Sequence, residues 1–186
     1  MNHTHTLRTK QLTTIALMTA ITCILAPLAI PIPISPVPIT LTNLVLYISI
    51  FILGWRSATI SYFIYLLLGL VGLPVFSGFA GGPGKLFGPT GGYLIGFIFL
   101  LVLSGWLIEH FNGNTWLNCG AMILGTLVTY AFGTTWLSAQ LDLTFLQGLA
   151  AGVFPYLIGD AVKILIALLV GPILQKRLNL WHKISN

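Results

Sequence analysis

Long apolar stretches, separated by short segments rich in proline, glycine or basic residues, run along almost the whole chain. Of the 186 residues, 56% are hydrophobic and only 6% are charged, and the mean hydropathy is +0.97. A water-soluble domain needs far more charge to cover its surface. About 20 apolar residues are enough to cross the hydrocarbon core of a bilayer as a helix. The sequence therefore predicts an all-α integral membrane protein.

Six segments have the composition of membrane-spanning helices, and we expect them to form a single transmembrane domain over residues 1–186. Their approximate ranges are 11–29, 39–54, 57–72, 91–109, 117–138 and 147–175. The second and third segments almost join across Gly54, Trp55 and Arg56, which predicts a tight turn at one membrane face.

The basic residues predict the orientation of the chain. With the N-terminus inside the cell, six of the eight Lys and Arg residues are cytoplasmic: Arg8, Lys10, Arg56, Lys176, Arg177 and Lys183. Lys85 then lies in an outer loop. Because cytoplasmic loops of membrane proteins carry the excess of Lys and Arg, we expect both termini on the cytoplasmic side of the cell membrane. The net charge of +5 is not clustered, which argues against a nucleic-acid partner.

Two predicted outer loops have unusual compositions. The first, residues 26–40, holds five of the ten prolines, which predicts a stiff, extended and non-helical segment. The second, residues 72–92, holds eight glycines and three prolines. Its apolar side chains favour a structured loop that faces a ligand over a flexible linker.

An acid and a base lie inside the sixth apolar segment. Asp160 and Lys163 have i,i+3 spacing, which places them on one face of a helix. Each charge at the centre of a membrane helix costs about 2.5 to 3.5 kcal/mol on insertion scales. A buried ion pair need not be there for stability, because well-packed apolar residues at the same positions often stabilise a protein equally well. We therefore favour a ligand-binding role over an ion pair that only fastens two helices.

The depth of this pair depends on Pro155. If one helix continues from Gly148, Asp160 lies about 18 Å along it. If the helix restarts after Pro155, Asp160 lies only about 6 Å from the new helix start. Two further polar candidates, Asn43 and Tyr93, stand at the outer ends of the second and fourth segments, beside the two unusual loops. Together these positions predict a pocket that opens outward.

Other motifs give no support to catalysis, a cofactor or a metal. The run GGPGKLFG has Phe79 and Leu86 where a P-loop needs Gly and Ser or Thr, so we expect no nucleotide hydrolysis by this chain. The carboxylates are far apart in sequence and no nucleophile has a base beside it, so we expect no enzyme. Cys23 and Cys119 lie in apolar stretches and are expected to pack as small apolar residues.

Three segments of the chain match a known family of membrane proteins. They are SPVPITLTNL (35–44), GLPVFSGFAGGPGKLFGPTGGYLIGF (72–97) and FPYLIGDAVKI (154–164). With them, nearly the whole chain resembles the BioY proteins, the biotin-binding S components of energy-coupling factor transporters. The GPTGGY segment is the most specific part of the resemblance. Asn43 differs from the Gln that many members carry near this position.

The resemblance implies a six-helix protein that captures biotin from outside with high affinity. It also implies partners, namely a transmembrane T component and two ABC-type ATPases, because S components have no motor. In this family an Ala-x-x-x-Ala pattern on the first helix faces the T component, which would give Ala16 and Ala20 that role.

Biotin also suits the polar residues by its chemistry. We expect Asp160 to accept a hydrogen bond from a ureido N–H and Lys163 to donate to the ligand. Asn43 and Tyr93 would add neutral hydrogen bonds. Residues of the Gly-rich loop would cover the apolar rings: Phe79, Gly81, Gly82 and Thr90.

Two other functions remain open on the sequence. In a self-sufficient secondary transporter, Asp160 would shuttle a proton, and uptake would collapse with the proton gradient. In a structural membrane protein, the pair would only join helices, and the purified protein would bind no small molecule.

Overall fold

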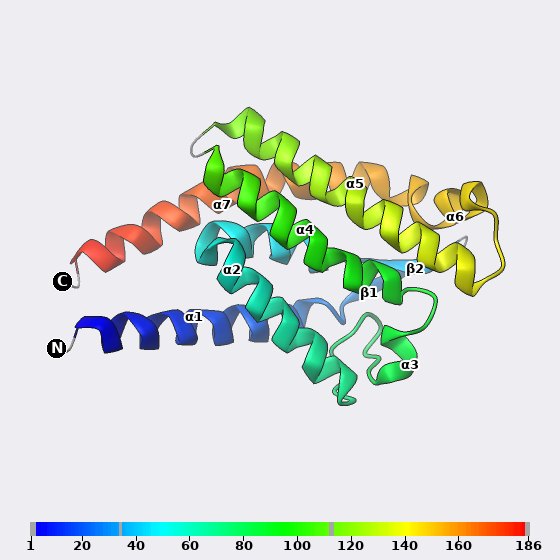
Figure 1. Cartoon of the computed structure of the whole chain (residues 1–186), viewed down its shortest axis with the longest axis horizontal. Coiled ribbons are helices and arrows are strands. Elements are labelled where there is room, and N and C mark those ends of the chain that lie inside the picture. The colour runs from blue at the N-terminus through cyan, green and yellow to red at the C-terminus, as the bar shows by residue number, and fades with distance from the viewer. Residues whose placement is uncertain (1–2, 34, 112–113, 185–186) are drawn as a thin grey trace.

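Helices make up most of the computed structural model, which describes residues 3–33, 35–111 and 114–184, with side chains described between residues 9 and 178. The long helices are α1 (His3–Leu25), α2 (Thr42–Leu70), α4 (Gly91–His110), α5 (Thr115–Gln140) and α7 (Leu157–Ile184) (Figure 1). The shorter elements are α3 (Pro83–Leu86), α6 (Phe145–Gly152), the 3-10 turn η1 (Phe154–Tyr156) and strands β1 (Ala29–Ile32) and β2 (Ser35–Thr40).

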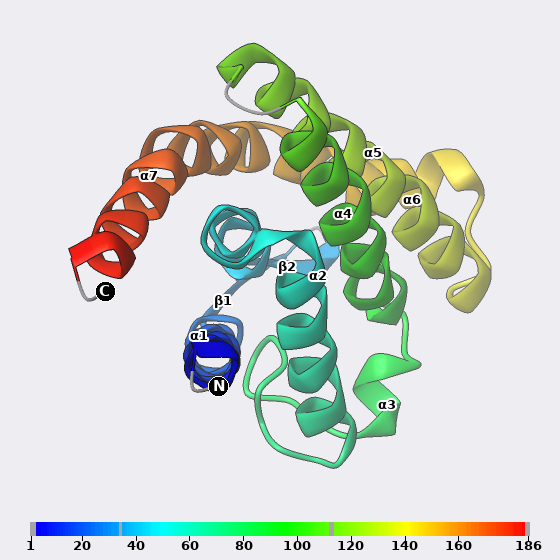
Figure 2. The same ribbon diagram turned by 60° about the vertical axis from the view of Figure 1, so that its left-hand side comes forward.

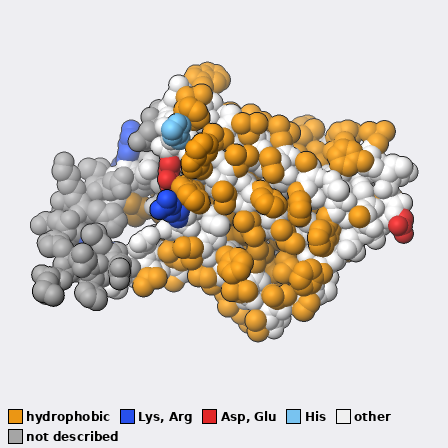
Figure 3. All heavy atoms as spheres, in the orientation of Figure 1, with side chains coloured by type: hydrophobic (Ala, Val, Ile, Leu, Met, Phe, Trp, Pro, Cys, Tyr) orange, Lys and Arg blue, Asp and Glu red, His pale blue; other side chains and the backbone are white. Residues whose placement is uncertain are grey.

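The described helices have the length and surface of membrane spans. Four helical segments are long and apolar enough to cross a bilayer: Thr42–Leu70, Gly91–His110, Thr115–Gln140 and Phe145–Leu178. Apolar side chains cover the middle of the molecular surface, whereas the Lys, Arg, Asp and Glu side chains in view lie toward its two ends (Figure 3). The structure therefore confirms a mostly helical chain with helices that could span a membrane, whereas the expected six spans stay a prediction.

Helix α2 changes direction at Gly54 (Figures 1 and 2). Gly54 has φ 74° and ψ 164°, a backbone conformation that glycine adopts at low cost. The backbone N–H of Trp55 then donates to Oε1 of Glu109 over 2.9 Å, so a carboxylate at the end of α4 caps the second part of α2. The two parts, residues 42–53 and 55–70, correspond to the second and third expected segments, and a single residue separates them.

The proline-rich segment forms a paired hairpin. Strand β1 runs antiparallel to β2, with Ala29 opposite Thr40 and Ile32 opposite Ser35. Each strand of a two-stranded sheet has a free edge, where the missing N–H of proline breaks no ladder hydrogen bond. The segment is extended, as its proline content predicts, but the strand pairing was not predicted.

The sixth expected segment, 147–175, is interrupted near Pro155. Helix α6 ends at Gly152, η1 contains Pro155, and α7 begins at Leu157. Because proline lacks an N–H and restricts the residue before it, it favours a restart at this point. The restarted helix is the second of the two alternatives for the depth of Asp160, which is the fourth residue of α7.

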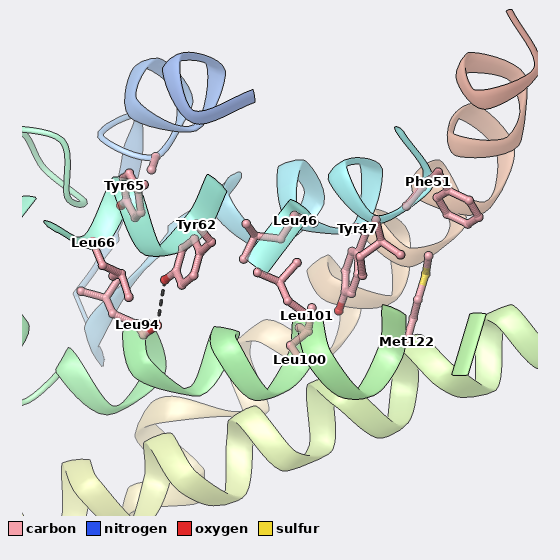
Figure 4. Packing of buried hydrophobic residues seen from close by; sticks show 14 of the residues in the cluster. Leu46, Tyr47, Phe51, Tyr62, Tyr65, Leu66, Leu94, Leu100, Leu101 and Met122 are labelled. Atoms are coloured by element: carbon pink, nitrogen blue, oxygen red, sulfur yellow. Dashed lines mark hydrogen bonds between the residues drawn. The ribbon is translucent and has the colours of Figure 1, made fainter. Parts of the chain in front are cut away.

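The core lies between α2, α4 and α5. Figure 4 shows side chains of α2 packed against α4, with the Tyr62 hydroxyl donating to the Leu94 carbonyl oxygen over 2.8 Å. Gly96 brings α4 close to α5, since a Cβ there would press on Thr129. The core thus fixes the helices whose ends surround the candidate site.

The two ends of the molecule differ in their elements. Both termini lie at one end, and the hairpin, α3 and α6 gather at the other (Figure 1). The side chains of Arg8 and Lys183, used to predict orientation, lie outside the described residues. The expected cytoplasmic placement of the termini stays a prediction.

Candidate functional site

A cavity lies among α2, α4, α5 and α7, beside the hairpin and the Gly-rich loop. It contains about 730 Å³ of space free of protein atoms when the open solvent at its mouth is included. Five of the eight expected binding residues line it: Asn43, Thr90, Tyr93, Asp160 and Lys163. The structure thus gathers residues from α2, α4 and α7 that are far apart in sequence.

The carboxylate of Asp160 is held by side chains from three helices. Its Oδ1 accepts from Nδ2 of Asn43 on α2 over 2.8 Å and from Nζ of Lys163 on α7 over 2.9 Å. Its Oδ2 accepts from the Tyr130 hydroxyl on α5 over 2.5 Å. The predicted i,i+3 ion pair is therefore present, and it is part of a larger network.

This network is largely removed from solvent. The two side chains of the ion pair are only 11% and 13% exposed, and Asn43 and Tyr130 are buried. Taking two charges out of water costs several kcal/mol per ion. The attraction between the two charges offsets this cost only when their geometry is good and further hydrogen bonds satisfy the remaining donors and acceptors. Asn43 and Tyr130 supply those hydrogen bonds, so the carboxylate remains in place before any ligand arrives.

The restart at Pro155 determines where Asp160 points. Asp160 stands in the first turn of α7, where the unpaired backbone N–H groups favour a negative charge. Lys163 follows one turn later and lies on the same face. The helix start thus brings the pair to the end of the bundle that contains the hairpin, rather than to the middle of a continuous span.

Tyr130 is a residue of the site that sequence reasoning missed. Its signal was a polar face on the apolar helix α5, where Thr126, Thr129, Tyr130 and Thr134 recur at helical spacing. All four are buried, and three of them, Thr126, Thr129 and Tyr130, line the cavity. Hydropathy alone identifies this segment as a span and does not distinguish its polar face.

Tyr93 lines the cavity with its hydroxyl already occupied. Its hydroxyl and that of Thr134 lie 3.2 Å apart, and either can donate. Gly133 and Gly152 make room for it, because a Cβ at Gly133 would meet the Tyr93 ring and one at Gly152 the Tyr93 hydroxyl. The expected hydrogen bond from Tyr93 to a ligand stays a prediction.

The hairpin is fastened over the site by hydroxyl groups. Oγ of Ser35 donates to the Ala151 carbonyl oxygen over 2.6 Å. The Tyr156 hydroxyl donates to Oγ of Ser35 over 2.7 Å and also to the Val37 carbonyl oxygen. Because Val37 and Tyr156 both line the cavity, these bonds hold β2 and η1 together at its wall.

Three expected residues of the Gly-rich loop, Phe79, Gly81 and Gly82, do not line this cavity. Phe79 is 64% exposed and borders a separate depression with residues of the hairpin. The loop turns there, because Gly78 and Phe79 both have positive φ, and the Gly78 N–H donates to the Pro27 carbonyl oxygen. The structure therefore does not bring these residues to Asp160, and the reason is the local turn.

Ala16 and Ala20 lie away from the cavity, on an exposed face of α1. Leu12, Leu17 and Ile24 are exposed on the same helix. Their expected role as a contact for a partner stays a prediction.

The described residues hold no cluster of three or more His, Cys, Asp or Glu side chains that could bind a metal. Cys23 and Cys119 are free and partly buried, so they form no disulfide.

The sequence of the chain matches one known protein family over almost its whole length. The BioY family model matches residues 1–180. The chain belongs to the BioY family. The resemblance noted in its sequence is therefore confirmed.

Named BioY relatives cover most of the chain. The biotin transporter BioY2 of Lactococcus lactis is 35% identical over 172 residues, which are 92% of this chain and 93% of the relative. The biotin transporter BioY of Thermotoga maritima is 37% identical over 148 residues, which are 79% of this chain and 86% of the relative.

One solved structure shares the fold of this chain. The crystal structure of the S component for biotin from an ECF-type ABC transporter superposes with a TM-score of 0.86 at 32% identity and covers 95% of both chains. The family is therefore that of a transporter component and not of an enzyme.

Proposed function

We propose that this BioY protein is the high-affinity biotin-binding subunit of an ATP-driven importer of the energy-coupling factor type. The observation that carries the proposal is the Asp160–Lys163 pair, held with Asn43 and Tyr130 at a cavity in a chain whose relatives are named biotin transporters. Biotin combines a polar ureido ring with an apolar bicycle. Such a ligand suits a cavity with one charged network and otherwise largely apolar walls.

The ion pair sets the orientation of the ligand in this proposal. Lys163 makes one hydrogen bond, to Asp160, among the described residues, and an ammonium group can donate three. Its remaining N–H groups donate to the ureido carbonyl oxygen, and Asp160 accepts from a neighbouring ureido N–H. The pair is neutral as a unit, so it favours a neutral polar ring over a free anion.

The cavity-lining aromatic and aliphatic residues then contact the apolar bicycle. Tyr93, Leu94, Phe97 and Leu100 form one wall on α4. Contacts of this kind contribute about 25 cal/mol for each Å² of apolar surface removed from water. The site needs no chemical step, and we infer that the chain binds and releases its ligand without catalysis.

The proposed topology has six passes through the cell membrane, with both termini in the cytoplasm. Its support is the change of direction at Gly54, which divides α2 into two helices, and the position of both termini at one end of the molecule. The basic residues Lys10, Arg56, Lys176 and Arg177 agree with this orientation by the positive-inside rule. The cavity then opens toward the outside.

The proposed partners are a transmembrane T component and two ABC-type ATPases. The chain has no P-loop of its own, and the similar solved structure is an S component of an ECF-type ABC transporter. Ala16 and Ala20 on the exposed face of α1 allow close approach of another helix and are the proposed contact.

The decisive experiment has two steps. Mass spectrometry of small molecules released from the purified protein identifies what it carries, and calorimetric titration with biotin measures affinity. We expect biotin in the extract and binding in the nanomolar range, about −12 kcal/mol. A different vitamin would overturn the substrate, whereas no bound molecule and no heat with biotin would overturn the function.

Reconstituted vesicles separate this proposal from secondary transport. We expect accumulation of radiolabelled biotin only when the T component, both ATPases and internal ATP are present. Accumulation by this chain alone that collapses when the proton gradient is removed would support the secondary transporter instead.

A further inference from the structure

The Asp160 carboxylate has little capacity left for a ligand. Each carboxylate oxygen accepts about two hydrogen bonds. Oδ1 already accepts from Asn43 and Lys163, and Oδ2 accepts from Tyr130. One acceptor position therefore remains, on Oδ2. A cyclic urea, however, has two N–H donors, and burying the second without a partner would cost about 1–3 kcal/mol.

Thr42 has the acceptor that is missing. It lies in the first turn of α2, next to Asn43, and it lines the cavity while being only 3% exposed. Among the described residues its hydroxyl has no hydrogen-bond partner. Two partnerless side-chain oxygens have almost no accessible surface, those of Asn118 and of Tyr65, which also lines the cavity. The Thr42 hydroxyl is not among them, so it keeps some accessible surface.

The other hydroxyls of the cavity wall are less suited to this role. Those of Thr126 and Thr129 donate to carbonyl oxygens of their own helix, and Thr126 also bonds Tyr47. Thr90 and Ser77 stand in the Gly-rich loop and are more exposed. Thr42 lines the same cavity as Asn43 and Asp160.

We propose that the Thr42 hydroxyl accepts the second ureido N–H of the ligand and so determines specificity for an intact cyclic urea. This inference rests on the proposed function. Lys163 donates to the carbonyl oxygen, Asp160 accepts one N–H, and Thr42 accepts the other. When the ligand fills the cavity, the Thr42 hydroxyl loses its contact with open space, and the ureido N–H gives it a hydrogen-bond partner there.

Calorimetric titration of three variants with biotin tests the hydroxyl. Thr42→Val keeps the shape and removes the acceptor, so we expect about tenfold weaker binding. Thr42→Ser keeps the acceptor and should bind within about threefold of the wild type. Thr59→Val is the matched control on the same helix, since the Thr59 hydroxyl bonds the Trp55 carbonyl oxygen and does not line the cavity.

Ligand analogues test which contact the hydroxyl makes. In each of two cyclic carbamates, one ureido N–H of biotin is replaced by oxygen. For the analogue that lacks the N–H facing Thr42, the wild type and Thr42→Val should bind equally. For the other analogue the tenfold difference should remain. If Thr42→Val does not fold, Thr42→Ala is titrated with the same analogues.

Three results would overturn the assignment. They are biotin binding by Thr42→Val within twofold of the wild type, a Thr42→Ser variant as weak as Thr42→Val, or the same difference between wild type and Thr42→Val for both carbamates. These leave biotin capture itself intact. Failure of the wild type to bind biotin would overturn the proposed function and this assignment with it.

Discussion

Replacing Asp160 by Asn is the sharpest test of the candidate site. The variant keeps the shape of the side chain but removes its charge and one acceptor oxygen. With its oxygen toward Asn43 and Lys163, the amide keeps those two hydrogen bonds, and its Nδ2 must then donate to the Tyr130 hydroxyl instead of accepting from it. The Lys163 ammonium group stays in the cavity wall without a negative charge beside it.

The structure gives the size of the effect. Removing one partner of a buried ion pair costs about 3–5 kcal/mol. Because this pair is 11% and 13% exposed, the lower end of that range applies. A bound ligand would exclude the remaining water and strengthen the penalty, so most of it falls on the complex. A cost of about 3 kcal/mol corresponds to roughly 100-fold weaker binding of biotin.

The assay combines calorimetric titration with thermal unfolding in detergent. Asp142→Asn is the matched control, because Asp142 is exposed and Asn also tolerates its positive φ of 51°. We expect the control to bind and melt like the wild type. An Asp160→Asn variant that is folded and binds biotin within threefold of the wild type would refute the reasoning.

A double variant separates ligand binding from a purely structural ion pair. Asp160→Asn combined with Lys163→Met removes both charges, and such replacement of a buried pair is often neutral for stability. We expect the double variant to melt closer to the wild type than Asp160→Asn does, yet to bind biotin no better. If it binds biotin as the wild type does, the pair serves only to join helices.

Three further changes test the surroundings of the site. Gly152→Ala should weaken biotin binding at least tenfold in titration, because its Cβ would displace the Tyr93 hydroxyl from the cavity wall. Tyr156→Phe removes the hydrogen bonds to β2 and should speed dissociation of labelled biotin several-fold. A dissociation rate equal to that of the wild type would show that these hydrogen bonds do not retain the ligand. Glu109→Gln weakens the cap on the Trp55 N–H and should lower thermal stability by about 1 kcal/mol without changing affinity.

The sequence predicted the helical spans because their signal is local. Hydropathy over a window identifies an apolar helix, and α4 occupies Gly91–His110 where 91–109 was expected. The ion pair was equally predictable, since i,i+3 spacing brings Asp160 and Lys163 together in any helix. Features of this kind need no knowledge of neighbouring segments.

Contacts between distant segments were harder to predict. The hairpin depends on strand pairing across the proline-rich loop, and prolines there predict an extended chain without indicating its partner. Tyr130 joins the site only because α5 packs beside α7, and the two lie 30 residues apart in sequence at this contact. Phe79 was assigned to the ligand from the composition of its loop, whereas a local turn with positive φ directs it outward.

The structural and ligand-binding roles of Asp160 need not exclude each other. Its hydrogen bonds join α2, α5 and α7 at one point, so the carboxylate is already oriented in the free protein. Ordering these side chains on binding would otherwise cost about 0.5–1.5 kcal/mol for each one immobilised. A network that fastens the helices therefore also prepares the site, and its remaining acceptor position is what a ligand N–H would occupy. Loss of Asp160 should then lower both stability and affinity, whereas loss of the Thr42 hydroxyl should lower affinity alone.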